Sequence, residues 1–191
     1  MAVNIMIVGV GGQGTLLASR ILGNTLISAG YDVKVSEVHG MSQRGGSVVT
    51  YVRSGDRVYS PLVDLGEADY ILAFEELEAL RALPYLKEGG TLLMNTQRID
   101  PMPVITGAAK YPEGIAETLG ARCRLIQADA LALAKEAGNA RCANIVLLGL
   151  LARQMDLPEE VWQEAIRTTV PERFQEVNLK AFGLGYRTEG R

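Results

Sequence analysis

An apolar segment at the front of the sequence leads directly into a glycine-rich loop. Residues 3–10 are rich in Val and Ile, as in a buried strand, and residues 15–22 repeat apolar side chains at helical spacing. Between them, Gly9, Gly11 and Gly14 match the pattern G-x-G-x-x-G, which carries structural meaning only where a strand precedes it and a helix follows. This order predicts an α/β chain built around a mostly parallel sheet.

The glycine loop allows two interpretations, a binding site and a packing turn. Glycine permits a tight turn and a close approach of the backbone to a ligand, and the free N–H groups of a helix N-terminus attract an anion. On this view Gly9, Gly11, Gly12, Gln13 and Gly14 are candidates for binding a phosphate group. The alternative is a strand-to-helix turn that needs glycine only for packing.

Strands and helices alternate along the rest of the chain. The expected strands are residues 3–10, 32–38, 48–53, 57–60, 69–74, 91–95 and 122–127. The expected helices are residues 14–28, 75–83, 115–119 and 129–137, followed by a helical part from residue 143 with helix starts at Pro158 and Pro171 and a frayed tail from residue 182. Turns are expected at residues 54–56 and 87–90, and an irregular connection or a short edge strand over residues 97–112. In the first helix, the residues expected to face the sheet are Leu16, Leu17, Ile21, Leu22 and Leu26.

These elements define the expected fold class. The sheet is mostly parallel and Rossmann-like, with helices on both faces and a helical C-terminal end. Strands 48–53 and 57–60 flank a short turn, which predicts a β-hairpin insertion and hence a mixed sheet. Because the 191 residues contain no repeat and no linker composition, we expect one domain over residues 1–191.

Composition argues against several classes of protein. A net charge of −3, with scattered Lys and Arg, argues against nucleic acid as the main partner. The N-terminal apolar run stops at glycines after a few residues, so we expect neither a signal peptide nor a membrane span, and a cytoplasmic protein. Cys123 and Cys142 lie far apart and there is one histidine, so we expect no metal site and two buried free thiols.

The most unusual segment, residues 39–47, follows the second expected strand. It brings His39, the only histidine, close in sequence to Arg44, Gly45, Gly46 and Ser47, at the sheet edge where ligands of open α/β folds collect. Histidine can exchange a proton near neutral pH, and arginine can bind a carboxylate or phosphate with two hydrogen bonds. His39 and Arg44 are therefore candidate catalytic residues, and Gly45, Gly46 and Ser47 are candidate cofactor contacts. The alternative is a loop in which His39 and Arg44 bind only neighbouring carbonyls.

Three acidic residues near strand ends are ambiguous. Glu37 falls near the position of the acid that binds the ribose in dinucleotide folds, which favours NAD, although acids at strand ends are common. Glu75 and Glu76 could form an acid–base pair, but acids at a helix start need no role beyond their interaction with the helix dipole. We favour the helix-start interpretation for this pair.

Three segments together resemble a known family. Residues 9–14 (GVGGQG), 37–48 (EVHGMSQRGGSV) and 59–62 (YSPL) resemble the gamma domain of the 2-oxoacid:ferredoxin oxidoreductases. The second segment is the most specific, and its form is most similar to the small (beta) subunits of indolepyruvate:ferredoxin oxidoreductases. The resemblance covers nearly the whole chain.

The resemblance implies a function that depends on other chains. Members of this family oxidatively decarboxylate a 2-oxoacid, form the acyl-CoA and transfer two electrons to ferredoxin. It implies a large alpha subunit that carries thiamine diphosphate and 4Fe–4S clusters, an aryl pyruvate as substrate, CoA as co-substrate, and no cofactor held tightly by this chain. The glycine loop and the His39–Arg44 segment would lie together and hold the CoA phosphates or shape the rim of the thiamine site. The alternatives are a free-standing NAD(P)-dependent dehydrogenase and a non-catalytic Rossmann-like binding module.

Overall fold

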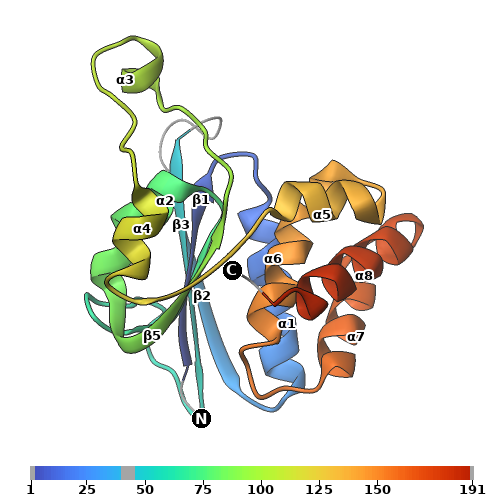
Figure 1. Cartoon of the computed structure of the whole chain (residues 1–191). Helices are drawn as coiled ribbons and strands as arrows, with labels where there is room; N and C mark the ends of the chain where they lie inside the picture. Colours follow the sequence, from blue (N-terminus) through green and yellow to red (C-terminus); the bar gives the residue numbers. More distant parts are fainter. Residues whose placement is uncertain (1–2, 40–45, 190–191) are drawn as a thin grey trace.

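A six-stranded sheet in the order β2-β3-β1-β4-β5-β6 forms the middle layer of the computed structural model, which describes residues 3–39 and 46–189 (Figure 1). The strands are β1 Val3–Val10, β2 Asp32–His39, β3 Ser47–Gly55, β4 Ala68–Ala73, β5 Leu86–Asn95 and β6 Arg124–Ala128. β1, β4, β5 and β6 pair in parallel, whereas β3 lies antiparallel between β1 and β2. β2 therefore runs in the direction of β1, and the prediction of a mostly parallel but mixed sheet is confirmed.

Helices cover both faces of the sheet (Figure 1). On one face lie α1 Thr15–Ser28, α5 Ala130–Ala137, α6 Ala143–Ala152, α7 Glu159–Thr169 and α8 Glu172–Arg187. On the other lie α2 Glu76–Ala82 and α4 Ile115–Gly120. Two short 3₁₀ helices, η1 Leu83–Tyr85 and η2 Ala140–Cys142, join neighbouring elements. α3 Met102–Ile105 covers neither face and lies beyond one end of the strands. Two separate apolar cores result, one on each face of the sheet.

The larger core is centred on α6, which is buried from Asn144 to Ala152 because its side chains are apolar on nearly every side. Its backbone approaches that of α8 closely through glycines. A Cβ on Gly149 would lie 2.2 Å from the carbonyl oxygen of Phe182, and a Cβ on Gly185 would lie 2.0 Å from the carbonyl oxygen of Val146. The helical part expected from residue 143 is confirmed by α6, which begins at Ala143.

The predicted hairpin is wrong in its second strand. Residues 57–60 form no strand, because both edges of β3 are already paired along their length, with β1 on one side and β2 on the other. Val58 instead donates its backbone N–H to a carboxylate oxygen of Asp32 at 2.8 Å. The antiparallel pair is formed by β2 and β3, so the chain reverses direction between His39 and Ser47 rather than at residues 54–56.

Three local expectations are corrected as well. Residues 87–90, predicted as a turn, belong to β5, where the pairing with β4 shifts register and Gly89 adopts a positive φ of 74°. The C-terminal tail does not fray at residue 182, because Gly185 supports the contact with α6 and α8 continues to Arg187. Leu16 is 41% exposed, since it faces a groove between α1 and the edge strand β2 rather than the sheet.

Candidate functional site

β1 and β4 are parallel neighbours, and the helices that follow their carboxyl ends pack on opposite faces of the sheet. β1 leads into α1 on one face of the sheet, and its parallel neighbour β4 leads into α2 on the opposite face. In open α/β sheets, the crevice beyond two such strands is the usual ligand site. The glycine loop that follows β1 lies at this crevice, as the sequence predicts.

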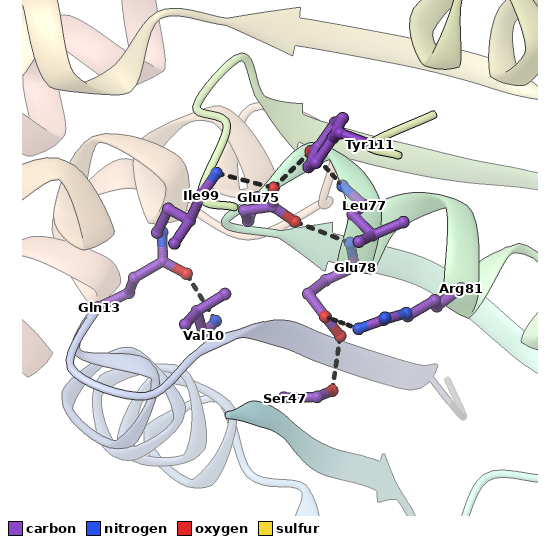
Figure 2. Close-up of polar contacts among 9 residues, drawn as sticks. All are labelled: Val10, Gln13, Ser47, Glu75, Leu77, Glu78, Arg81, Ile99 and Tyr111. Carbon is purple, nitrogen blue, oxygen red and sulfur yellow. Dashed lines mark hydrogen bonds and ion pairs between the residues drawn. The ribbon is translucent and has the colours of Figure 1, made fainter. Parts of the chain in front are cut away.

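The side chain of Gln13 bridges the two strand ends at this crevice. Its Oε1 accepts the backbone N–H of Val10 at 2.7 Å, and its Nε2 donates to the carbonyl oxygen of Phe74 at 2.9 Å and to Oε1 of Gln97 at 3.1 Å. One amide thus ties the end of β1 to the residue after β4 (Figure 2 shows the contact with Val10). Gln13 thus links the two strands, and both polar atoms of its side chain form hydrogen bonds within the protein.

Packing explains the glycine at two of the loop positions. A Cβ on Gly9 would lie 2.8 Å from Oε1 of Gln13, and a Cβ on Gly14 would lie 2.7 Å from Nδ2 of Asn144. Gly14 also has a left-handed φ of 83°, and its carbonyl oxygen accepts a hydrogen bond from that Asn144 amide at 3.2 Å. Gly12 has a φ of 99° with open space around the Cβ position. The loop therefore meets the requirements of the packing turn, and phosphate binding stays a prediction.

The second glycine-rich segment lies beside the first where the structure describes it. The backbone N–H of Gly11 donates to the carbonyl oxygen of Gly46 at 2.9 Å, and Val10 pairs with Ser47 in the sheet. His39 ends β2 opposite Val48. Arg44 and Gly45, two of the predicted site residues, lie outside the described residues, as does the side chain of His39.

Ser47 joins a short chain of polar contacts at this edge. Its hydroxyl donates to Oε2 of Glu78 at 2.5 Å, and Nη1 of Arg81 donates to Oε1 of the same carboxylate at 2.5 Å (Figure 2). The Glu78 side chain is 5% exposed and the Arg81 side chain 52% exposed. These residues line a hollow of about 220 Å³, smaller than the roughly 300–1,000 Å³ of a typical small-molecule site.

Glu75 is a buried carboxylate that three donors satisfy. Its Oε2 caps α2 by accepting the backbone N–H of Glu78 at 3.0 Å. Its Oε1 accepts the backbone N–H of Ile99 at 3.0 Å and the hydroxyl of Tyr111 at 2.5 Å (Figure 2). Burial, and then the hydrogen bond to Glu75, raises the pKa of Tyr111 well above its ordinary value.

The helix-start interpretation of Glu75 is confirmed, because its carboxylate caps α2. Glu76 follows in the first turn of the same helix. Burial, and then the adjacent Glu75 carboxylate, raises the pKa of Glu76. Glu75 therefore has a structural role: its carboxylate holds together the segments that meet at this edge.

Glu37 does not occupy the position that a dinucleotide site requires. It lies on β2, and β3 separates β2 from β1, which places it roughly 10 Å across the sheet from β1. Its Oε1 accepts the hydroxyl of Ser19 at 3.1 Å, at the groove between α1 and β2. In a dinucleotide fold the corresponding acid ends the strand beside β1.

Two asparagines complete the edge, and the sequence reasoning missed both. Asn95 is 1% exposed, donates to the carbonyl oxygen of Phe74 at 3.1 Å and accepts the backbone N–H of Ala130 at 3.1 Å. Asn144 supports Gly14 from the start of α6. Each lies at the border of an apolar run, and a lone amide at such a border is the signal that could have indicated them.

Cys123 and Cys142 are free, Cys142 is buried, and burial raises the pKa of both thiols. Across residues 3–39 and 46–189, no group of three or more His, Cys, Asp or Glu side chains is arranged to hold a metal ion. Within the same ranges, no helix combines the length and the apolar character of a membrane span.

Comparison with known proteins defines the family. The model for pyruvate ferredoxin/flavodoxin oxidoreductase matches residues 4–188. Indolepyruvate oxidoreductase subunit IorB of Thermococcus kodakarensis is 46% identical over 95% of this chain and 93% of its own length. The crystal structure of a keto/oxoacid ferredoxin oxidoreductase gamma subunit from Geobacter sulfurreducens is 29% identical, with a TM-score of 0.72 over 96% of both chains. The chain therefore belongs to the pyruvate ferredoxin/flavodoxin oxidoreductase family, and it is a subunit of the 2-oxoacid:ferredoxin oxidoreductase type, which confirms the resemblance of residues 9–14 and 37–48.

In some relatives the same unit is part of a longer chain. Ketoisovalerate oxidoreductase subunit VorA of Methanothermobacter marburgensis is 32% identical over 96% of this chain, yet the match spans only 36% of VorA. In that protein the unit is thus covalently joined to further polypeptide.

Proposed function

We propose that this chain is the small subunit of an oxidoreductase that acts on an aryl pyruvate such as indolepyruvate. The reaction releases carbon dioxide, joins the remaining acyl group to CoA, and passes two electrons to ferredoxin. The observation that carries this proposal is the 46% identity to an indolepyruvate oxidoreductase subunit over 93% of that subunit's length. We further propose that residues 1–191 act as one gamma-type domain and that the enzyme works in the cytoplasm.

The division of labour follows from the chemistry of the side chains. A 4Fe–4S cluster requires about four thiolates, and this chain has only Cys123 and Cys142, which belong to cores on opposite faces of the sheet. The two thiols do not fit such a cluster. We therefore assign the clusters, together with thiamine diphosphate, to a larger partner subunit that passes electrons to ferredoxin.

The edge where β1 ends and β3 begins is the part of this chain that we assign to an active centre shared with the larger subunit. Gly11 and Gly46 are hydrogen-bonded there, and the hollow beside Ser47 is too small to enclose a cofactor. We propose that the larger subunit completes the site. His39, Arg44, Gly45 and the glycine loop would then face the phosphates of CoA or the rim of the thiamine site.

The test is a tagged purification of the chain from its native host under anaerobic conditions. We expect a larger subunit to co-purify with iron–sulfur absorbance, and the preparation to reduce a viologen dye only when aryl pyruvate and CoA are both present. A colourless preparation without a larger chain would contradict the proposal. Titration with NADH would then distinguish a dehydrogenase from a binding module.

Arg44→Ala tests the role of the shared edge, with Arg57→Ala as a matched control on an exposed arginine. We expect Arg44→Ala to raise the apparent KM for CoA or for the 2-oxoacid while the complex stays assembled, and Arg57→Ala to leave both unchanged. Loss of the larger subunit from Arg44→Ala alone would identify residue 44 as an interface contact instead.

A further inference from the structure

Residues 98–111 form an arm that leaves the body of the molecule beyond the carboxyl edge of the sheet, with α3 at its far end (Figure 1). Its tip is apolar and open to solvent: Met102 is 65% exposed and Ile105 is 66% exposed. From residue 101 to residue 109 the sequence is PMPVITGAA, without one charged side chain. The chain as a whole has 21% charged residues, so this stretch differs from an ordinary solvated loop.

The base of the arm is fixed by a single buried oxygen. Oε1 of Glu75 accepts the N–H of Ile99, where the arm leaves the body, and the hydroxyl of Tyr111, where it returns (Figure 2). The Arg98 guanidinium lies 4.1 Å from the centre of the Tyr111 ring and pairs with Asp100. Both ends of the arm are therefore held together and against α2.

The tip also has a defined local structure. The N–H of Thr106 donates to the carbonyl oxygen of Met102, and the N–H of Ala109 donates to that of Pro103, both at 2.9 Å. A connection of this length inside a compact domain usually has a function. An ordered arm that presents apolar side chains to water is typical of a segment that another protein surface covers.

The choice of partner rests on the family and on the position of the arm. In VorA, a unit similar to this chain makes up about a third of a longer chain, which supplies further polypeptide that could cover such an arm. Because residues 101–109 carry no charge, we expect the surface that binds them to be uncharged. A charged groove would lose its hydration on binding without gaining an ion pair. Pro101, Met102 and Pro103 line the same hollow as Ser47 and Glu78, so the arm is continuous with the edge assigned to the shared active centre.

We propose that residues 98–111 are a docking arm whose tip, Met102 and Ile105 above all, inserts into an uncharged apolar groove of the larger oxidoreductase subunit. This inference rests on the proposed function, because it assumes that such a subunit exists. Glu75 is the residue that positions the arm. Docking at this place brings the larger subunit against the glycine loop.

The experiment compares two double variants of the tagged chain, each produced together with the larger subunit. Met102→Asp with Ile105→Asp changes the tip. Leu62→Asp with Leu65→Asp is the matched control, because these leucines are 53% and 67% exposed in the connection between β3 and β4. We expect the tip variant to recover about tenfold less of the larger subunit, as for anchor residues of an interface, with circular dichroism and Tm unchanged. The control should recover as much as the wild type.

A cross-linking measurement supports the test without depending on weakened binding. A photoreactive amino acid at position 102 should cross-link to the larger subunit, and one at position 59, whose tyrosine is 81% exposed, should not. Full recovery by the tip variant, without a cross-link from position 102, would overturn the docking arm and leave the proposed function intact. A wild-type chain that recovers no larger subunit would contradict the proposed function itself. A dimer of the wild type that becomes a monomer in the tip variant would identify a second copy as the partner and overturn the proposal.

Discussion

At the scale of single residues, Gln13 joins two strands of the sheet. Its side-chain amide bonds Val10 at the end of β1, Phe74 after β4, and Gln97. Replacing Gln13 by alanine leaves an N–H and a carbonyl without these partners. A deletion of this kind costs about 1–3 kcal/mol of unfolding free energy.

Urea unfolding of Gln13→Ala measures that loss. Gln163→Ala is the control, because the Gln163 amide donates to Glu159 one turn away on the same helix, α7. This variant should change stability by less than about 0.5 kcal/mol. We also expect no saturable binding of NADH to the wild-type chain. Equal stabilities of the two variants would show that the Gln13 link is not needed to hold the two strands together.

The hydrogen bonds of Tyr111 give a second prediction, which concerns how the stability of the folded chain changes with pH. The hydroxyl donates to Glu75 and accepts the N–H of Leu77 at 3.1 Å, so Tyr111→Phe should cost about 1.5–3 kcal/mol at neutral pH. Because the folded-state pKa of Tyr111 is raised, the unfolded chain loses this proton first as pH rises. The stabilisation is complete below the ordinary tyrosine pKa of about 10 and is lost above it.

Unfolding of the wild type and of Tyr111→Phe at about pH 8 and about pH 10.5 tests the sign. The difference in stability between the two proteins should shrink at the higher pH. A difference that stays constant, or grows, would mean that the Tyr111 proton is not held by the folded state.

At the scale of elements, the sequence correctly predicted features that residues close together in the chain determine, such as the two ends of α5. α5 begins after Asp129, whose carboxylate caps it, and ends at Gly138 with a φ of 116°, both as expected from the cap residues. The failure at residues 57–60 has a different origin. An alternating segment indicates a strand but not its partner, and β3 had already found partners on both edges.

The contact between α6 and α8 gives a prediction about packing. Gly149→Ala would place a methyl group 2.2 Å from a backbone oxygen of α8, which cannot rotate away, so the helices must separate. We expect a loss of about 3 kcal/mol or more, at the upper end of overpacking effects. Gly183→Ala is the control on α8, the partner helix in this contact, because the nearest atoms to its methyl would belong to the flexible end of Arg187, at 3.1 Å.

Thermal unfolding of the two glycine variants tests whether the loss comes from the close contact between α6 and α8 or from any methyl group added to one of these helices. Gly183→Ala should be neutral, or more stable by up to about 1 kcal/mol from helix propensity. Similar losses in both variants would contradict the close approach of the two backbones.

At the scale of the whole molecule, the sequence indicated that the two glycine-rich segments lie at one edge, but not the side-chain contacts that build this edge. The two glycine-rich segments were expected to meet, and Gly11 does bond Gly46. Gln13, Glu75, Asn95 and Asn144 come from four separate parts of the chain, and only the order of the strands brings them to one edge. No local pattern encodes that order, so a local signal could indicate a single residue such as Asn95 but not the partners that it bonds.

The molecule consists of a stable body and an exposed arm, residues 98–111. Amide hydrogen exchange rates should differ between these two parts. Amides of α6 lie in the buried core and should exchange only when the whole domain unfolds. The backbone hydrogen bonds of residues 101–109 join only near neighbours in an exposed arm, so these amides should open locally and exchange fast.

When the larger subunit binds, exchange at residues 101–109 should slow by about tenfold or more, because covered amides open less often. The connection over residues 56–66, with its exposed Leu62 and Leu65, should exchange as before. Protection of residues 56–66 without protection of the arm would move the interface to the opposite edge of the sheet. The position of the protected segment therefore decides which edge of the sheet faces the active centre of the complex.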